Sequence, residues 1–202
     1  MAKRIVLAAV LGGLAMFLWS SIAHMALGLG SLGIQDIPNE QAMMGAMKSN
    51  LPQQSGFYFF PGLGVAPGAS RTERNAAMNV YQQKVANGPS GILVYHSSGQ
   101  KAISAGQLLM ELGTNVVQAL LAAILLAFAG LRSYGARVGF VALAGVMAGI
   151  TTNISYWTWY GFPGSYTAGY AFTEIMGYVC IGLVAAAIVK NSKAVAISAH
   201  AA

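Results

Sequence analysis

The chain has 202 residues, of which 56% are hydrophobic and only 8% are charged, with a formal net charge of +6. Charged residues make up about a quarter of an ordinary soluble domain, so this composition excludes a soluble globular protein. It predicts an integral membrane protein in contact with a lipid bilayer.

Four apolar segments are long enough to cross a hydrocarbon core of about 30 Å, which takes roughly 20 residues of helix. They are residues 5–27, 103–131, 138–159 and 166–189. The predicted fold class is therefore membrane all-α, a four-transmembrane-helix bundle with a small α+β extracytoplasmic insert between helices 1 and 2. In domain terms, residues 1–27 form the first span, 28–102 the insert, and 103–202 spans 2–4 with a cytoplasmic tail.

The cations indicate the orientation, because short loops rich in Lys and Arg stay in the cytoplasm. Two cations precede the first span, two lie between the second and third, and two follow the fourth: Lys3, Arg4, Arg132, Arg137, Lys190 and Lys193. No acid accompanies them. We therefore expect both termini to be cytoplasmic and the insert to lie outside. This topology accounts for most of the net charge, so we expect no nucleic-acid partner.

The first span has a second interpretation. Lys3, Arg4, an apolar run and the small residues around Ala23 also resemble a cleavable secretory signal, which would leave the topology of the rest unchanged. The only cysteine, Cys180, lies in the fourth span, so no intrachain disulfide is possible, and we interpret it as a small buried hydrophobe.

Signals for two helices and two strands alternate along the insert. Asn39 is a predicted N-cap for a helix to about residue 49, and Ser70 with Glu73 has capping-box spacing for a helix to about residue 86. The stretches GFYFFPG (56–62) and GILVYHS (91–97) are predicted strands, which we expect to pair in one sheet covered by the second helix. So small a domain is expected to need the helix ends or a partner for stability.

Polar side chains are expected to gather in the outer half of the bilayer, at the ends of the spans away from the cations. Helical rise places six of them there from four different helices: His24, Gln107, Glu111, Asn115, Asn153 and Glu174. Gln107, Glu111 and Asn115, with Gln118, recur on one helix face. An ionisable group in a span is a functional hypothesis by default, so the pattern predicts an outward-facing polar pocket.

Several roles remain open for this pocket. Its carboxylates could meet water or Lys101 at the interface while the amides hydrogen-bond neighbouring helices, or it could handle a proton, a polar small molecule or a lipid head group. His24 and the two acids lie on separate helices without metal-ligand spacing, and Met43, Met44 and Met47 favour an apolar face over a copper site, so no metal is expected.

No nucleophile elbow, phosphate-binding glycine loop or zinc motif occurs in the sequence. We therefore expect no catalytic residue, no cofactor and no enzymatic activity, with the polar pocket as the one feature that keeps an enzyme possible.

Small residues at helical spacing predict close helix packing. Gly145 and Gly149 form GxxxG in the third span, and Ala8 with Gly12 and Ala9 with Gly13 form small-xxx-small pairs in the first. Such faces join helices within one bundle or between subunits, and the pattern does not separate these two cases.

Four stretches, WSSIAHMALGLG, PNEQ, GFYFFPG and YWTWYGFP, resemble those of small bacterial inner-membrane proteins that have four spans and no assigned activity. The resemblance implies a bacterial cytoplasmic membrane and the four-helix layout, and it implies no catalytic residue. We expect an accessory or partner-binding subunit that associates with other membrane protein subunits; the alternative is a membrane protein that handles a small molecule, a metal or a proton in the polar pocket.

Overall fold

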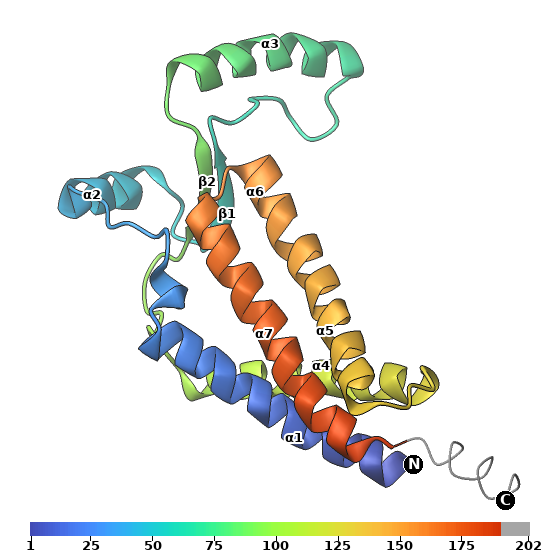
Figure 1. The fold of residues 1–202 in the computed structure, drawn as a ribbon. Coiled ribbons are helices and arrows are strands. Elements are labelled where there is room, and N and C mark those ends of the chain that lie inside the picture. Colours follow the sequence, from blue (N-terminus) through green and yellow to red (C-terminus); the bar gives the residue numbers. More distant parts are fainter. Residues whose placement is uncertain (191–202) are drawn as a thin grey trace, which may run out of the picture. The chain divides into compact units, whose positions relative to one another are not determined.

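The computed structural model describes residues 1–190, and these form two units that are treated separately. Of the described residues, 1–34 and 102–190 form a helical unit, while Gln35–Lys101 form the insert. Figure 1 shows the elements of both units.

The helical unit confirms the prediction of four apolar helices long enough to cross a membrane. The first is α1 (Ala2–Ser21), which continues through the π-helix η1 (Ile22–Ala26) before the short 3₁₀ turn η2 (Leu29–Ser31). The second is α4 (Ala105–Phe128). The third runs through α5 (Tyr134–Gly149), the π-helix η3 (Ile150–Ile154) and α6 (Ser155–Tyr160), and the fourth is α7 (Gly164–Ile188).

Helix α7 lies at the centre of the unit. Helix α1 packs along both α4 and α7, whereas α5 packs along α7 on the other side and touches α4 only slightly. In Figure 1, α7 accordingly lies between α1 and α5. The buried core is rich in alanine: Ala8, Met16, Ala119, Ala122, Ala123, Leu126, Val141, Ile181, Ala185 and Val189.

Small residues let these helices approach closely, as the small-residue pattern predicts. A Cβ atom added to Gly13 of α1 would lie 2.6 Å from the Val116 Cα of α4, so the two backbones are in direct contact there. One added to Gly177 of α7 would lie 2.9 Å from Met16 Cε of α1. The large apolar side chains point outward instead, among them Leu109, Met147 and Phe128, which are 68%, 65% and 85% exposed. Such a surface suits lipid and not water.

The insert contains α2 (Glu40–Asn50), β1 (Gly56–Phe60), α3 (Arg71–Asn87) and β2 (Gly91–Tyr95). The strands pair antiparallel in one two-stranded sheet, as predicted, with Phe57 opposite Val94. Both predicted caps are present: the Asn39 side chain accepts a hydrogen bond from the Ala42 amide, and Ser70 and Glu73 form a full capping box.

One prediction about the insert is not met. We expected α3 to cover the sheet, but none of the α3 side chains is buried. The helix is polar on average, and Met78, Tyr81 and Val85 form only a narrow apolar stripe, which gives little surface to pack on a strand pair.

Candidate functional site

The structure joins two residues of the predicted polar pocket, Asn153 and Glu174. The Asn153 side chain is only 7% exposed, and its Nδ2 donates hydrogen bonds to the Gly149 carbonyl oxygen at 3.0 Å and to Glu174 Oε2 at 3.2 Å. Asn153 belongs to the π-helix η3 and Glu174 to α7, so the contact links two spans. π-helical turns inside α-helices are frequent at functional sites.

Glycines on α5 make this contact possible. A Cβ atom at Gly145 would lie 2.5 Å from Tyr178 Cβ, and one at Gly149 would lie 3.4 Å from Ile175 Cγ1. The two helices therefore approach without intervening side chains, and a short amide can reach a carboxylate on the neighbouring helix. The GxxxG pair of the third span thus lies against α7 of the same chain.

The Glu174 carboxylate is half-buried and forms no ion pair with any residue of 1–190. An unpaired carboxylate in a hydrocarbon environment is costly, and one neutral amide donor only partly replaces its hydration. Three chemical states satisfy such a group: a bound proton, a bound cation, or a cationic or hydrogen-bonding group from another molecule.

The backbone beside Glu174 is tied to α1. Trp19 Nε1 donates a hydrogen bond to the Thr173 carbonyl oxygen at 2.9 Å, and the Trp19 ring meets Phe172 edge-on. The Thr173 hydroxyl donates to the Gly169 carbonyl within α7. Glu174 thus projects from a stretch of α7 held by both neighbouring helices.

The other predicted pocket residues form no hydrogen bond with Asn153 or Glu174 in the described part of the chain. Gln107 Oε1 accepts hydrogen bonds from the amide and hydroxyl of Ser104, so Gln107 caps the start of α4. His24 Nδ1 bonds the Ser20 carbonyl oxygen of its own helix. Glu111 is exposed and has no hydrogen bond to the described residues.

Asn115 is the most deeply buried member of the predicted set, at 2% exposure. Its Nδ2 has no hydrogen-bond partner within residues 1–190, and neither has the buried Oε1 of Gln118 one turn later. Both are next in sequence to residues at the tight contact of α4 with α1: Asn115 directly precedes Val116, and Gln118 directly precedes Ala119, whose Cβ would lie 3.3 Å from a Cβ atom added to Gly12.

Aromatic rings form a continuous series near the Asn153–Glu174 pair. His24 of η1 meets Tyr170 edge-on, Tyr170 stacks on Tyr166 with ring centroids 4.3 Å apart, and Tyr166 meets Phe162 edge-on. Phe162 in turn stacks on Tyr156 of α6. Such rings are typical of a membrane interface and here mark the end of the helical unit away from its cations.

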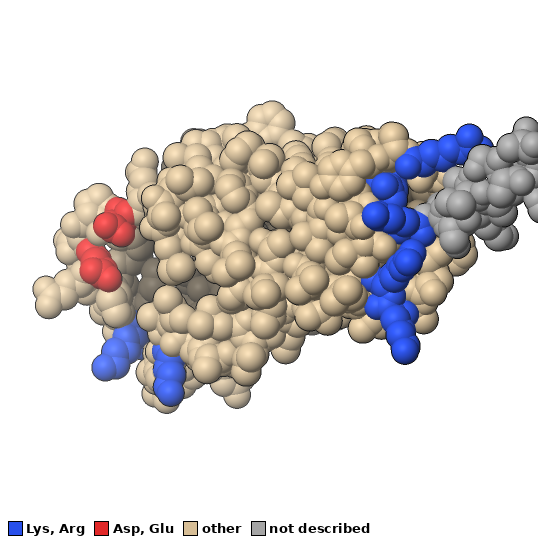
Figure 2. Space-filling view, turned by 60° about the horizontal axis from the view of Figure 1, so that its bottom comes forward, with Lys and Arg blue, Asp and Glu red and all other residues tan. Residues whose placement is uncertain are grey.

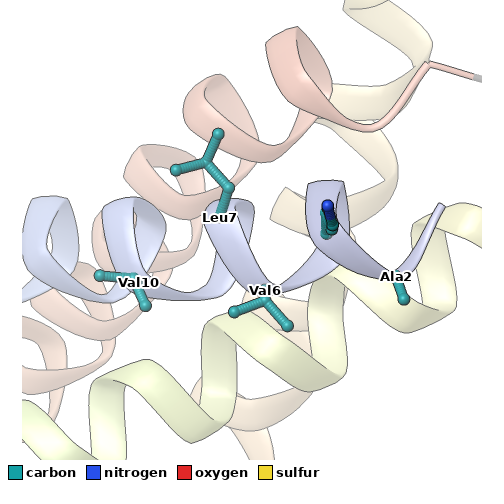
Figure 3. Close-up of a pocket in the computed structure, with 5 residues that line it drawn as sticks. Ala2, Val6, Leu7 and Val10 are labelled. Atoms are coloured by element: carbon teal, nitrogen blue, oxygen red, sulfur yellow. The ribbon is translucent and has the colours of Figure 1, made fainter.

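Two features lie elsewhere. A shallow apolar hollow on α1 is lined by Ala2, Lys3, Val6, Leu7 and Val10, and Figure 3 shows its apolar side chains pointing to different sides of the helix. It lacks the convergent polar groups of a ligand pocket. Within residues 1–190 no three His, Cys, Asp or Glu side chains come close enough together to hold a metal ion.

The sequence analysis counted Arg137 only among the cations that indicate the orientation, but in the structure this residue also joins two helices. Arg137, at the start of α5, is 9% exposed, and its Nη1 donates to the Val189 carbonyl oxygen at 3.0 Å. The only feature of the sequence that could have pointed to this contact is that no acid lies near Arg137.

Comparison with models of known protein families, with curated proteins and with solved structures gives no match to this chain.

Proposed function

We propose that the protein is a non-enzymatic accessory or partner-binding subunit of a membrane complex. The observation behind this proposal is that no residue of Gln35–Lys101 is buried, although the segment has two helices and a sheet. A folded segment without a core needs a second surface to bury its apolar groups. We infer that other membrane protein subunits provide this surface.

The sheet supplies the best candidate contact. Phe57 and Val94 face each other across the strand pair and lie on the same side of it, with exposures of 55% and 61%. An isolated two-stranded sheet is marginally stable in water, so a partner that covers this side would stabilise it. Aromatic and β-branched side chains are suited to such a contact.

The test is the size of the protein extracted from its own membranes in mild detergent. We expect the wild type to migrate in native gels as an assembly larger than one chain, and Phe57→Ser with Val94→Ser to migrate as a single chain. Gln82→Ser, on the exposed face of α3, is the matched control and should keep the assembly. A wild type that runs as one chain from native membranes would contradict the proposal.

The proposed location is the bacterial cytoplasmic membrane, with both termini inside and the insert outside. The cations at one end of the spans support this orientation. In a Cys180→Ala background, Asn75→Cys should react with an impermeant thiol reagent added outside intact cells. Arg132→Cys should react only after permeabilisation, and the opposite labelling pattern would reverse the topology.

A second candidate function is supported by the contact between Glu174 and Asn153. A half-buried carboxyl group without a cationic partner, held by an amide from a π-helical turn, is suited to binding and releasing a proton or a small cation. Glu111, exposed and without such a partner, lacks this environment.

Infrared spectra of the reconstituted protein test this alternative. A proton held by Glu174 gives the carbonyl band of a protonated carboxyl group near neutral pH, and Glu174→Gln should remove it. Glu111→Gln is the matched control and should leave the band. Two results together would exclude this second function: the wild-type spectrum lacks that band, and added monovalent cations do not change the spectrum.

A further inference from the structure

The cations of the helical unit gather at one end, as Figure 2 shows, and Arg137 is the most buried of them. Its side chain is held against the last residues of α7, because Nη1 donates to the Val189 carbonyl oxygen. Its Nε atom is also buried and has no hydrogen-bond partner within residues 1–190. A guanidinium group offers five N–H donors, so this contact leaves much of its capacity unused.

No acid balances this charge. The five acids of the chain lie in the insert or farther along the spans, and none forms an ion pair with a cation within residues 1–190. The neighbouring charges are of the same sign, since Arg132 shortly precedes α5 and Lys190 directly follows the bound Val189 carbonyl. Arg137 also lies in the first turn of α5, at the positive end of the helix dipole. The carbonyl end of α7 at Val189 carries only a partial negative charge, so these features together leave a net positive charge that favours an anion.

The depth of Arg137 identifies the kind of anion. It lies three residues after Tyr134, where the third span begins, or about 5 Å along the helix from its first residue. The third span has 27 residues and is about 40 Å long, which exceeds the hydrocarbon core of about 30 Å, so its first turn can reach the phosphate groups of the lipids. The exposed side chain of Phe140, three residues after Arg137 on α5, is an apolar neighbour that suits an acyl chain of the same lipid.

We propose that Arg137 anchors a binding site for the phosphate of an anionic phospholipid, with Arg132 and Lys190 as additional cations. Arginine suits phosphate because its planar donors form strong, charge-assisted hydrogen bonds with phosphate oxygens. The contact with Val189 positions the guanidinium, so the ordered end of α7 belongs to the site. This site is independent of the proposed partner contact of the insert.

Native mass spectrometry of the full-length, delipidated protein in detergent tests the proposal. Titration with phosphatidylglycerol should give bound lipid at lower concentrations than titration with phosphatidylcholine. Arg137→Gln should weaken phosphatidylglycerol binding by about tenfold, the effect of losing one charge-assisted hydrogen bond. Arg4→Gln, an exposed cation at the same end of the helical unit, is the matched control and should weaken it much less.

Arg137→Lys separates a binding role from a purely structural one, because lysine keeps the charge without the planar donors. We expect this variant to retain a preference for phosphatidylglycerol with reduced affinity, even if Arg137→Gln does not fold. Inorganic phosphate added alone should displace the lipid only weakly. Equal binding of both lipids by the wild type, or an unchanged preference in a folded Arg137→Gln variant, would overturn the proposal, and so would complete displacement by inorganic phosphate.

Discussion

The contact of α1 with α4 at Gly13 leads to a graded prediction about stability. Gly13 lies against the α4 backbone, where an added Cβ atom would be 2.6 Å from Val116 Cα and 2.7 Å from its nitrogen. Gly12 is less crowded, since its nearest neighbour would be Ala119 Cβ at 3.3 Å. A Cβ atom added to Gly113 of α4 would meet no other atom within 4 Å. The same change to alanine therefore meets three different environments.

Gly13→Ala should destabilise the protein most. To reach an ordinary contact distance the two backbones would have to separate by several tenths of an ångström, because neither backbone can rotate away as a side chain does. Overpacking of this kind costs about 1–3 kcal/mol, while replacing a helical glycine by alanine recovers roughly 0.5–1 kcal/mol. Because Gly13 meets backbone atoms, the upper part of the overpacking range, about 2–3 kcal/mol, applies, and the expected net loss is about 1–2.5 kcal/mol for Gly13→Ala. We expect about zero for Gly12→Ala and a gain of roughly 0.5–1 kcal/mol for Gly113→Ala.

The measurement is reversible unfolding of the purified protein in mixed micelles with increasing SDS, followed by far-ultraviolet circular dichroism. The order of stability should be Gly113→Ala, then Gly12→Ala, then Gly13→Ala. A Gly13→Ala variant as stable as Gly113→Ala would show that α1 and α4 do not touch through their backbones, and the reasoning from small-residue packing would fail.

Three further predictions use the same unfolding assay or the far-ultraviolet circular dichroism spectrum of the full-length protein. Asn115→Leu should leave stability within about 1 kcal/mol of wild type, because it removes a buried donor without a partner in the described chain; a large loss would show that this amide is bonded in the native protein. Trp19→Phe should cost roughly 0.5–1.5 kcal/mol through the lost interhelical hydrogen bond, whereas the exposed Trp157→Phe should change little. Ser70→Ala should reduce helicity at neutral pH by removing a cap worth about 1 kcal/mol. The Ser70 hydroxyl and amide lower the pKa of Glu73, so the part of the cap that depends on the Glu73 carboxylate should be fully present above about pH 4 and be lost as the pH falls through the lowered pKa. The bond from the Glu73 amide to the Ser70 hydroxyl remains, so the effect of Ser70→Ala should shrink at low pH without vanishing, and a pH-independent difference would contradict this.

Local features of the fold could be predicted from the sequence because each depends on nearby residues. The four spans follow from length and hydropathy, and the capping box follows from the spacing of Ser70 and Glu73. The same logic could have placed Gln107 correctly. Ser104 lies three residues before Gln107, so the sequence predicts a capping box at the start of α4. In that capping box Gln107 Oε1 accepts from both the amide and the hydroxyl of Ser104, which leaves it no free acceptor for a pocket.

The contacts between spans could not be predicted in the same way. Glu111 and Glu174 have similar depth and chemistry, yet only Glu174 meets an amide from another helix. The difference depends on how each helix is rotated about its axis. Close contact of Gly145 and Gly149 with α7 fixes the rotation of the third span and so turns Asn153 toward Glu174. Periodicity gives the residues that share a face, but it does not say which neighbouring helix that face will meet.

The distribution of burial links these observations to the proposed role. The helical unit has a buried core of its own that is rich in small residues, whereas the insert, which joins it between Ile34 and Ala102, contains no buried residue. A segment that buries none of its residues and exposes aromatic and β-branched side chains has that surface available for binding. Glu174 lies instead in the helical unit, half-buried at the contact of η3 with α7, and it belongs to the second candidate function.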